Sequence, residues 1–169
     1  RLIGNVLQND HPISFVYDIP LQNADRELAA PDTVIDPTDT RVPPKTLLYP
    51  GTTSTRDNVQ CTSCHNPHTT YEKFLRMSRW QEGETPTTKQ ICRNCHVKPG
   101  WENTLGPLSS HRTSTKSFDA TLPASNAGLE NKTMANAGCL ACHDTHTIQG
   151  AERLLRDAVD SATYPAGNA

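Results

Sequence analysis

The run Cys61-Thr62-Ser63-Cys64-His65 has the pattern C-x-x-C-H, and the same pattern returns at residues 92–96 and 139–143. These three copies contain all six cysteines of the chain, which are Cys61, Cys64, Cys92, Cys95, Cys139 and Cys142. The pattern is the attachment signal for c-type haem. The sequence therefore predicts three covalent haem c groups, each carrying one iron.

The spacing of the motif matches the chemistry of haem attachment. Two intervening residues place the two thiols beside neighbouring vinyl groups of the porphyrin, and the next histidine binds the iron as proximal ligand. A zinc site or a set of disulfides accounts for cysteines alone, but neither explains a histidine after every second cysteine. We expect the proximal ligands to be His65, His96 and His143.

The remaining histidines are candidates for the second axial position of each iron. The chain has seven histidines, and the four outside the motifs are His11, His68, His111 and His146. Methionine is the competing ligand type, at Met77 or Met134, but we expect Met77 to serve in packing. Ligation by two histidines predicts low reduction potentials, because a His/Met pair raises the potential.

Two of these candidates follow a proximal histidine after three residues, namely His68 after His65 and His146 after His143. Three residues span at most about 10 Å. Ligands on opposite faces of one haem hold their Cα atoms about 12 Å apart, since each metal–nitrogen bond is about 2 Å long. Neither histidine can therefore serve the haem of its own motif, and a ligand at either position would draw two haems together.

The order of the motifs predicts one domain over residues 1–169, with a first repeat at about 10–100 and a partial repeat at about 107–160. A Leu-Arg pair follows the first motif at 75–76 and the third at 155–156. By this repeat His11 serves the first haem, His68 the second and His111 the third. His146 is then a surface residue, a vestige or a ligand for a neighbouring subunit.

The composition predicts little regular structure. Hydrophobic residues make up 34% of the chain and aromatic residues 5%, beside 9 glycines and 13 prolines, so the haems must supply much of the apolar surface. We expect a multihaem cytochrome c fold that is mostly coil with a few short helices and minimal strand. The expected helices are 71–80 and 151–159, the expected strand is 13–17, and residues 31–60 and 107–137 are expected to be surface loops.

Charge and hydropathy restrict the partners and the compartment. The formal net charge is −2 without a basic tract, which argues against a nucleic-acid partner. No apolar run is long enough for a transmembrane segment, and no signal peptide is visible, so we expect a mature form. Haem c is attached outside the cytoplasmic membrane, which predicts an extracytoplasmic protein. Asn131-Lys132-Thr133 is a glycosylation sequon.

The succession of His-Pro, C-x-x-C-H-x-P-H, a Leu-Arg pair and a second C-x-x-C-H resembles the doubled-CxxCH multihaem c-type cytochromes. Within that group the chain is similar to subunits of extracellular cytochrome filaments, or nanowires. The resemblance implies a conductive homopolymer, not an enzyme, in which His11 or His146 ligates a haem of the next subunit. Its partners would be other redox proteins or extracellular electron acceptors. A discrete periplasmic carrier, or the electron-donor subunit of a reductase, is the alternative.

Overall fold

The computed structural model describes residues 10–36, 39–40, 46–50, 56–85, 87–102, 109–121, 128–146, 154 and 156. The chain divides into two compact units. The large unit is Ile13–Thr113, and the small unit is Arg1–Pro12 together with Ser114–Ala169. Most of the described residues lie outside helices and strands, which confirms the prediction of a mostly coiled chain. The prediction of one domain over residues 1–169 stays a prediction.

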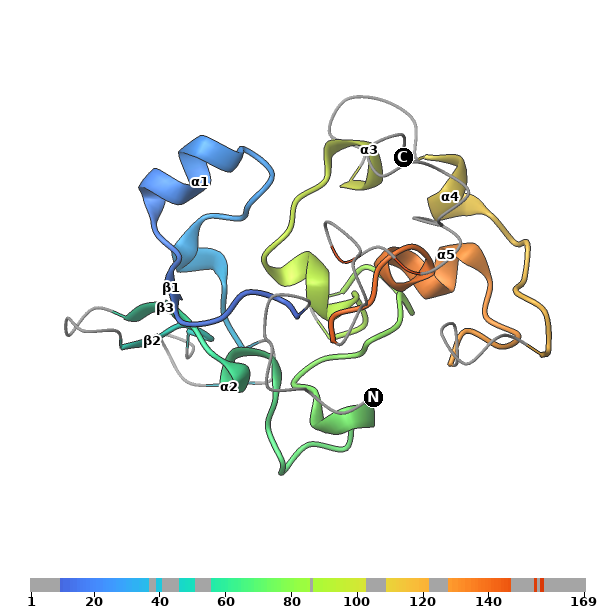
Figure 1. Ribbon diagram of the computed structural model, residues 1–169, viewed down its shortest axis with the longest axis horizontal. Coiled ribbons are helices and arrows are strands. Elements are labelled where there is room, and N and C mark those ends of the chain that lie inside the picture. Colours follow the sequence, from blue (N-terminus) through green and yellow to red (C-terminus); the bar gives the residue numbers. More distant parts are fainter. Residues whose placement is uncertain are drawn as a thin grey trace. The chain divides into compact units, whose positions relative to one another are not determined.

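A three-stranded antiparallel sheet in the large unit leads the chain into the first motif. Its strands are β1 (Phe15–Val16), β2 (Tyr49–Pro50) and β3 (Arg56–Val59), in the order β1-β3-β2. Phe15 pairs with Val59. The expected strand at 13–17 is thus confirmed, although it is shorter. Figure 1 shows α2 (Cys61–Cys64), which begins directly after β3, beside this sheet.

The longest helix, α1 (Ile19–Asp25), is capped at both ends by local chemistry. The Asp18 carboxylate accepts a hydrogen bond from the Leu21 N–H at 2.9 Å, which satisfies one open donor of the first turn. The helix ends at Arg26, whose φ of 62° turns the chain away. The other short elements of the large unit are η2 (Pro31–Thr33), η3 (Glu72–Phe74), η4 (Ile91–Asn94), α3 (Pro99–Glu102) and α4 (Ser110–Thr113).

The core of the large unit contradicts the expected surface loop at 31–60. Its buried members are Tyr17, Val34, Leu47, Leu48 and Val59, and four of these belong to that segment. The proline, threonine and aspartate content predicted a loop, but the few apolar side chains between them are the ones that fold inward. Burial of a Val or Leu side chain contributes about 1.5–3 kcal/mol, which outweighs a weak local preference.

The expected helix at 71–80 is also wrong. Only η3 forms there, because Lys73 and Phe74 have left-handed φ values of 58° and 57°. Leu75 then leaves the helical path and forms an antiparallel bridge with His65. The expected helix at 151–159 lies outside the described residues except for Leu154 and Arg156.

The small unit contains α5 (Met134–Ala137), which continues into η6 (Gly138–Ala141). The Thr133 hydroxyl caps α5 by accepting a hydrogen bond from the Asn136 N–H at 3.1 Å. Buried Leu129, Ala137 and Leu140 give this unit an apolar interior beside the third motif. The expected loop at 107–137 is therefore interrupted by α4 and α5 and includes buried side chains.

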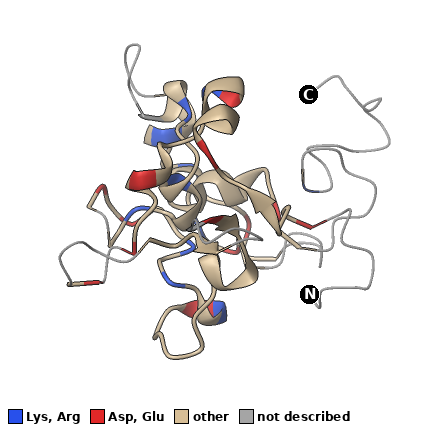
Figure 2. Ribbon diagram, turned by 90° about the vertical axis from the view of Figure 1, so that its left-hand side faces the viewer, with Lys and Arg blue, Asp and Glu red and all other residues tan. Residues whose placement is uncertain are grey.

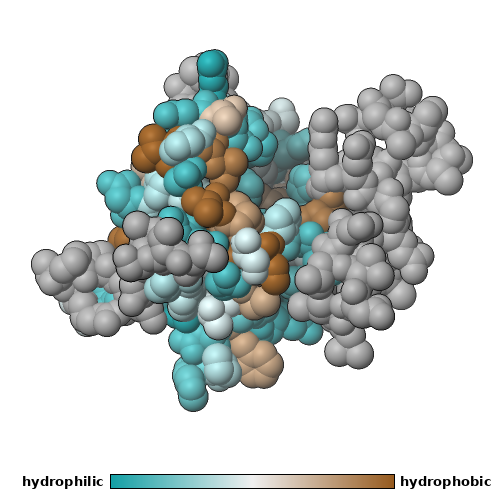
Figure 3. Space-filling model, turned by 60° about the vertical axis from the view of Figure 1, so that its left-hand side comes forward, coloured by the Kyte–Doolittle hydropathy of each residue, from teal (hydrophilic) through white to brown (hydrophobic). Residues whose placement is uncertain are grey.

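Positively and negatively charged residues are interspersed along the described ribbon (Figure 2). On the face drawn in Figure 3, hydrophobic side chains form small patches between hydrophilic ones. Within the described ranges, no helix has the length and apolar character that crossing a membrane requires.

Candidate haem-attachment sites

Each C-x-x-C-H motif begins with a single helical turn. Cys61–Cys64 form the α-helical turn α2, whereas the second and third motifs begin inside the 3-10 turns η4 and η6. In all three the histidine N–H donates to the carbonyl of the first cysteine at 2.9 Å. Residues three apart on a helical turn are neighbours on its surface. The turn therefore presents both thiols of each motif on one side, as attachment to two vinyl groups of one ring requires.

A short antiparallel ladder follows each turn. The carbonyl of the second cysteine accepts from the N–H of Arg76, Ala29 or Arg156, at 2.9, 2.7 and 2.8 Å in motif order. The N–H of the residue after the histidine donates to the carbonyl of Phe74, Glu27 or Leu154, at 2.7, 2.7 and 2.9 Å. The paired segment lies after the first and third motifs in the sequence, but before the second. The three motifs are thus three copies of one backbone arrangement.

The ring of His65 is set for metal binding. Its Nδ1 atom lies 3.0 Å from the carbonyl oxygen of Lys73. A carbonyl oxygen only accepts, so Nδ1 carries the proton and Nε2 has the lone pair that an iron needs. Metal-binding histidines ordinarily donate their other ring N–H in this way. The residues of the first motif therefore fit the haem that the sequence predicts.

The six cysteines are separate thiols in the structure, with no disulfide between them. Burial raises the pKa of the Cys95 thiol to about 12, and the nearby Cys64 thiol adds to the shift. Among the described residues, which include every cysteine, no three Cys, His, Asp or Glu side chains cluster as in a preformed zinc site.

Two distal candidates, His68 and His111, belong to the large unit, and both are exposed. His68 lies in a tight turn, where its N–H donates to the Asn66 side chain at 3.1 Å. His111 lies in α4. No hydrogen bond of either imidazole is found among the described residues. Their roles as ligands stay predictions.

The other two candidates, His11 and His146, lie side by side in the small unit. The His11 N–H donates to the Thr145 carbonyl at 2.9 Å, and its Nδ1 lies 2.9 Å from the Pro12 carbonyl. The Nδ1 atom of His146 lies 3.2 Å from a carboxylate oxygen of Asp10, whose side chain is 5% exposed. Both rings thus have Nδ1 engaged. The sequence did not single out Asp10.

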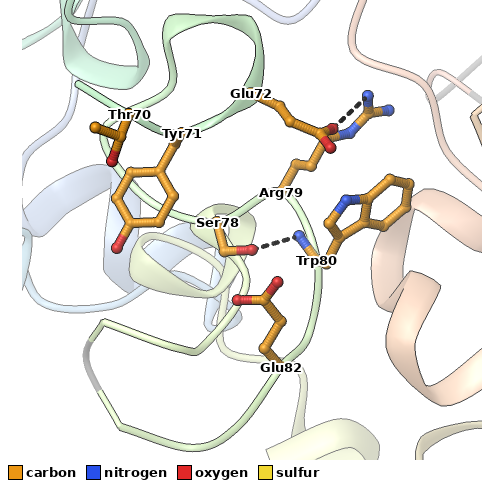
Figure 4. A pocket seen from close by; sticks show the side chains of 7 residues that line it. All are labelled: Thr70, Tyr71, Glu72, Ser78, Arg79, Trp80 and Glu82. Carbon is orange, nitrogen blue, oxygen red and sulfur yellow. Dashed lines mark hydrogen bonds and ion pairs between the residues drawn. The ribbon is translucent and has the colours of Figure 1, made fainter. Parts of the chain in front are cut away.

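A small pocket lies between the first and second motifs along the chain (Figure 4). Residues 70–72, 78–80 and 82 line it. The Arg79 guanidinium stacks 4.5 Å from the centre of the Trp80 ring and lies 3.7 Å from the Glu72 carboxylate. These contacts hold the linker that separates the two motifs.

Two buried arginines, Arg76 and Arg156, also belong to the sites. The repeated Leu-Arg pair was visible in the sequence, but no role for it followed from spacing alone. Both guanidinium groups contact carbonyls of the motif turns. A Leu-Arg pair at similar offsets, with Arg76 11 residues after His65 and Arg156 13 residues after His143, was the signal that could have identified them.

Residues 55–100 match a family of the description "Doubled CXXCH motif". The match spans the first two motifs, and the third lies outside it. Comparisons with curated proteins and with solved structures found no significant match. The family match supports a multihaem c-type cytochrome that binds haem covalently and transfers electrons. It gives no support for a similarity to filament subunits.

Proposed function

We propose that the chain is an electron-transfer protein with three covalent haems, one on each motif. The family match covers the first two motifs. The proposal extends to the third motif because its backbone hydrogen bonds are equivalent to those of the first. Residues 139–143 and 61–65 share the hydrogen bond from the histidine N–H to the carbonyl of the first cysteine, and they share the ladder that follows, with equivalent bonds within 0.2 Å of each other in length. A chance C-x-x-C-H sequence has no reason to reproduce this arrangement.

Each haem is held by two thioethers and one proximal histidine, His65, His96 or His143. The bound haems supply one-electron chemistry at iron, whose potential depends on the axial ligands and their surroundings. We assign the distal positions of the second and third haems to His68 and His111, and that of the first haem to His11 of the same chain or of a neighbouring copy. The exposure of His68 and His111 agrees with side chains that reach toward a group outside the polypeptide.

The mass of the denatured holoprotein tests the number of haems. We expect the mass of the polypeptide plus three haems, and the double variant Cys139→Ala/Cys142→Ala should lose one. The matched variant Cys61→Ala/Cys64→Ala should also lose one. A wild-type protein with two haems, unchanged by the substitutions at 139 and 142, would refute the assignment of the third motif. Low-spin spectra for every haem are expected from ligation by two histidines.

We further propose that the protein is extracytoplasmic and is the repeating subunit of an extracellular filament. In such a filament each copy would give one distal ligand to a haem of its neighbour, and because each copy has three irons and four distal candidates, one histidine would remain spare. His11 and His146 are the candidates for this ligation in trans. Identical subunits joined head to tail form an open polymer when their rotation does not close.

Negative-stain microscopy of the native protein over a range of concentrations tests this assembly. Filaments are expected, and they should shorten or vanish in whichever of His11→Ala and His146→Ala removes the shared ligand. Discrete particles at every concentration would refute the filament and favour a periplasmic carrier or a reductase subunit.

A further inference from the structure

Arg76 and Arg156 are both buried arginines, at 9% and 3% exposure. An arginine is rarely buried unless its charge and its N–H donors are satisfied. Both follow a C-x-x-C-H turn, and both donate their backbone N–H to the carbonyl of the second cysteine. Their side chains return to the same turn, so each arginine contacts its motif twice.

The contacts of Arg76 connect the first motif to the rest of the large unit. Its Nε donates to the Thr62 carbonyl inside the turn at 2.7 Å. One terminal nitrogen lies 3.1 Å from the Asp36 carboxylate, and the other donates to the Tyr49 hydroxyl at 3.0 Å. Every nitrogen of the guanidinium therefore has a protein partner. The carboxylate also compensates the charge, which makes this arginine a poor candidate for binding a haem propionate.

Arg156 reproduces the central contact in the small unit. Its Nε donates to the Leu140 carbonyl at 2.7 Å, and Leu140 occupies the same place in its motif as Thr62. The same Nε lies 3.0 Å from the carbonyl of the proximal His143. Asp144 compensates the charge at 3.6 Å.

We propose that Arg76 and Arg156 are positioning residues that set the orientation of the proximal histidine at the first and third haems. This inference rests on the proposed haem attachment. At the first site, Arg76 holds the segment that carries the Lys73 carbonyl, which accepts from His65. At the third site, Arg156 contacts the backbone of His143 itself. A hydrogen bond to the ring N–H makes the imidazole more basic, which stabilises ferric iron.

The second motif has a different arrangement. Ala29 occupies the position of the arginine in its ladder. The Tyr17 hydroxyl lies 2.9 Å from the Ala29 carbonyl and 3.1 Å from the Cys95 carbonyl instead. Only the first and third motifs thus have an arginine at this position. Replacing either arginine should therefore leave the reduction potential of the second haem unchanged.

Arg76→Lys and Arg156→Lys in the holoprotein test the inference, because lysine keeps the charge but cannot reproduce the Nε contact. The readouts are the number of covalent haems by mass and the individual reduction potentials by spectroelectrochemistry. We expect three haems in both variants and an upward shift of one potential in each, at a different haem. His65→Met and His143→Met identify the haem concerned. Arg79→Lys, whose guanidinium contacts no motif, is the matched control and should shift none.

Unchanged potentials in both variants would overturn the inference, as would an equal shift in Arg79→Lys. Failure of both variants to give folded holoprotein would also overturn it, since the arginines would then be residues of the fold alone. A wild-type protein without covalent haem would instead refute the proposed function.

Discussion

The Nδ1–H of His65 donates to the carbonyl of Lys73 across 3.0 Å. That carbonyl is directed by a backbone with φ of 58°, a left-handed conformation that costs a residue with a Cβ about 1–2 kcal/mol. Phe74 shares this conformation, and the pair then leads into the ladder that follows the first motif. Backbone strain at two adjacent residues is thus associated with the orientation of one predicted iron ligand.

Substitution at position 73 separates the backbone conformation from the carbonyl contact. Lys73→Gly keeps the carbonyl and removes the Cβ clash, so the free energy of unfolding should change by less than about 1 kcal/mol. Lys73→Val should lower it by about 1–2 kcal/mol, because a branched side chain fits this conformation poorly. Denaturant unfolding checks both, with Glu72→Val as the exposed neighbour expected to change it by less than about 0.5 kcal/mol. If Lys73→Val were as stable as Lys73→Gly, the backbone at position 73 would not be strained.

The hydroxyl of Tyr17 is expected to contribute to the stability of the large unit, because it is a buried hydrogen-bond donor. The side chain is 2% exposed and its hydroxyl serves the carbonyls of Ala29 and Cys95. Tyr17→Phe leaves these acceptors without that donor, which should cost about 1–3 kcal/mol of unfolding free energy. Tyr71→Phe, which removes a longer contact of 3.4 Å at the surface, is the control and should cost far less. Equal losses in the two variants would contradict this role.

Glu84 should contribute to stability in a pH-dependent way. Burial opposes its ionisation, but hydrogen bonds from Arg93 and Arg112 outweigh burial and hold its pKa below the usual 4.5. A lowered pKa in the folded state contributes stability above pH 4.5, and the contribution is lost as the pH falls through the folded value. Because the side chain is 55% exposed, Glu84→Gln should cost only about 1 kcal/mol at pH 7.

The measurement is the unfolding midpoint of Glu84→Gln and the native protein between pH 7 and pH 3. The two curves should converge in acid, whereas exposed Glu82→Gln should follow the native curve throughout. A difference for Glu84→Gln that persists unchanged in acid would assign the effect to packing instead of charge.

His68 and His146 occupy equivalent places after their motifs and are predicted to differ in role. His68→Met should raise the potential of one haem and retain all covalent haem, because methionine ligation raises the potential. His146→Met should leave the potentials of the dispersed subunit unchanged. Potentiometric titration followed in the visible spectrum checks both variants. An unmoved set of potentials in His68→Met would show that His68 is not a ligand.

The chemistry of this chain was accessible from its sequence because haem attachment depends on local spacing. Two cysteines and a histidine within five residues form one turn, and the three turns indeed share their hydrogen bonds. The helix expected at 71–80 does not form, because the apolar pattern of the segment carries no information about its pairing with the first motif. Leu75 pairs with His65 instead of continuing a helix, and Lys73 and Phe74 adopt the conformation that this pairing needs.

The sequence by itself predicted the cysteine pairs and the proximal histidines and determined the low content of regular structure, since each depends on residues close together in the chain or on overall composition. Only the tertiary structure decided what completes each turn. The ladder partner of the second motif comes from residues 27–29, far upstream, whereas the first and third use the residues that follow them. Buried backbone carbonyl and N–H groups need hydrogen-bond partners, and these partners can come from any part of the chain. The sequence pattern of a motif therefore does not predict which distant segment pairs with it.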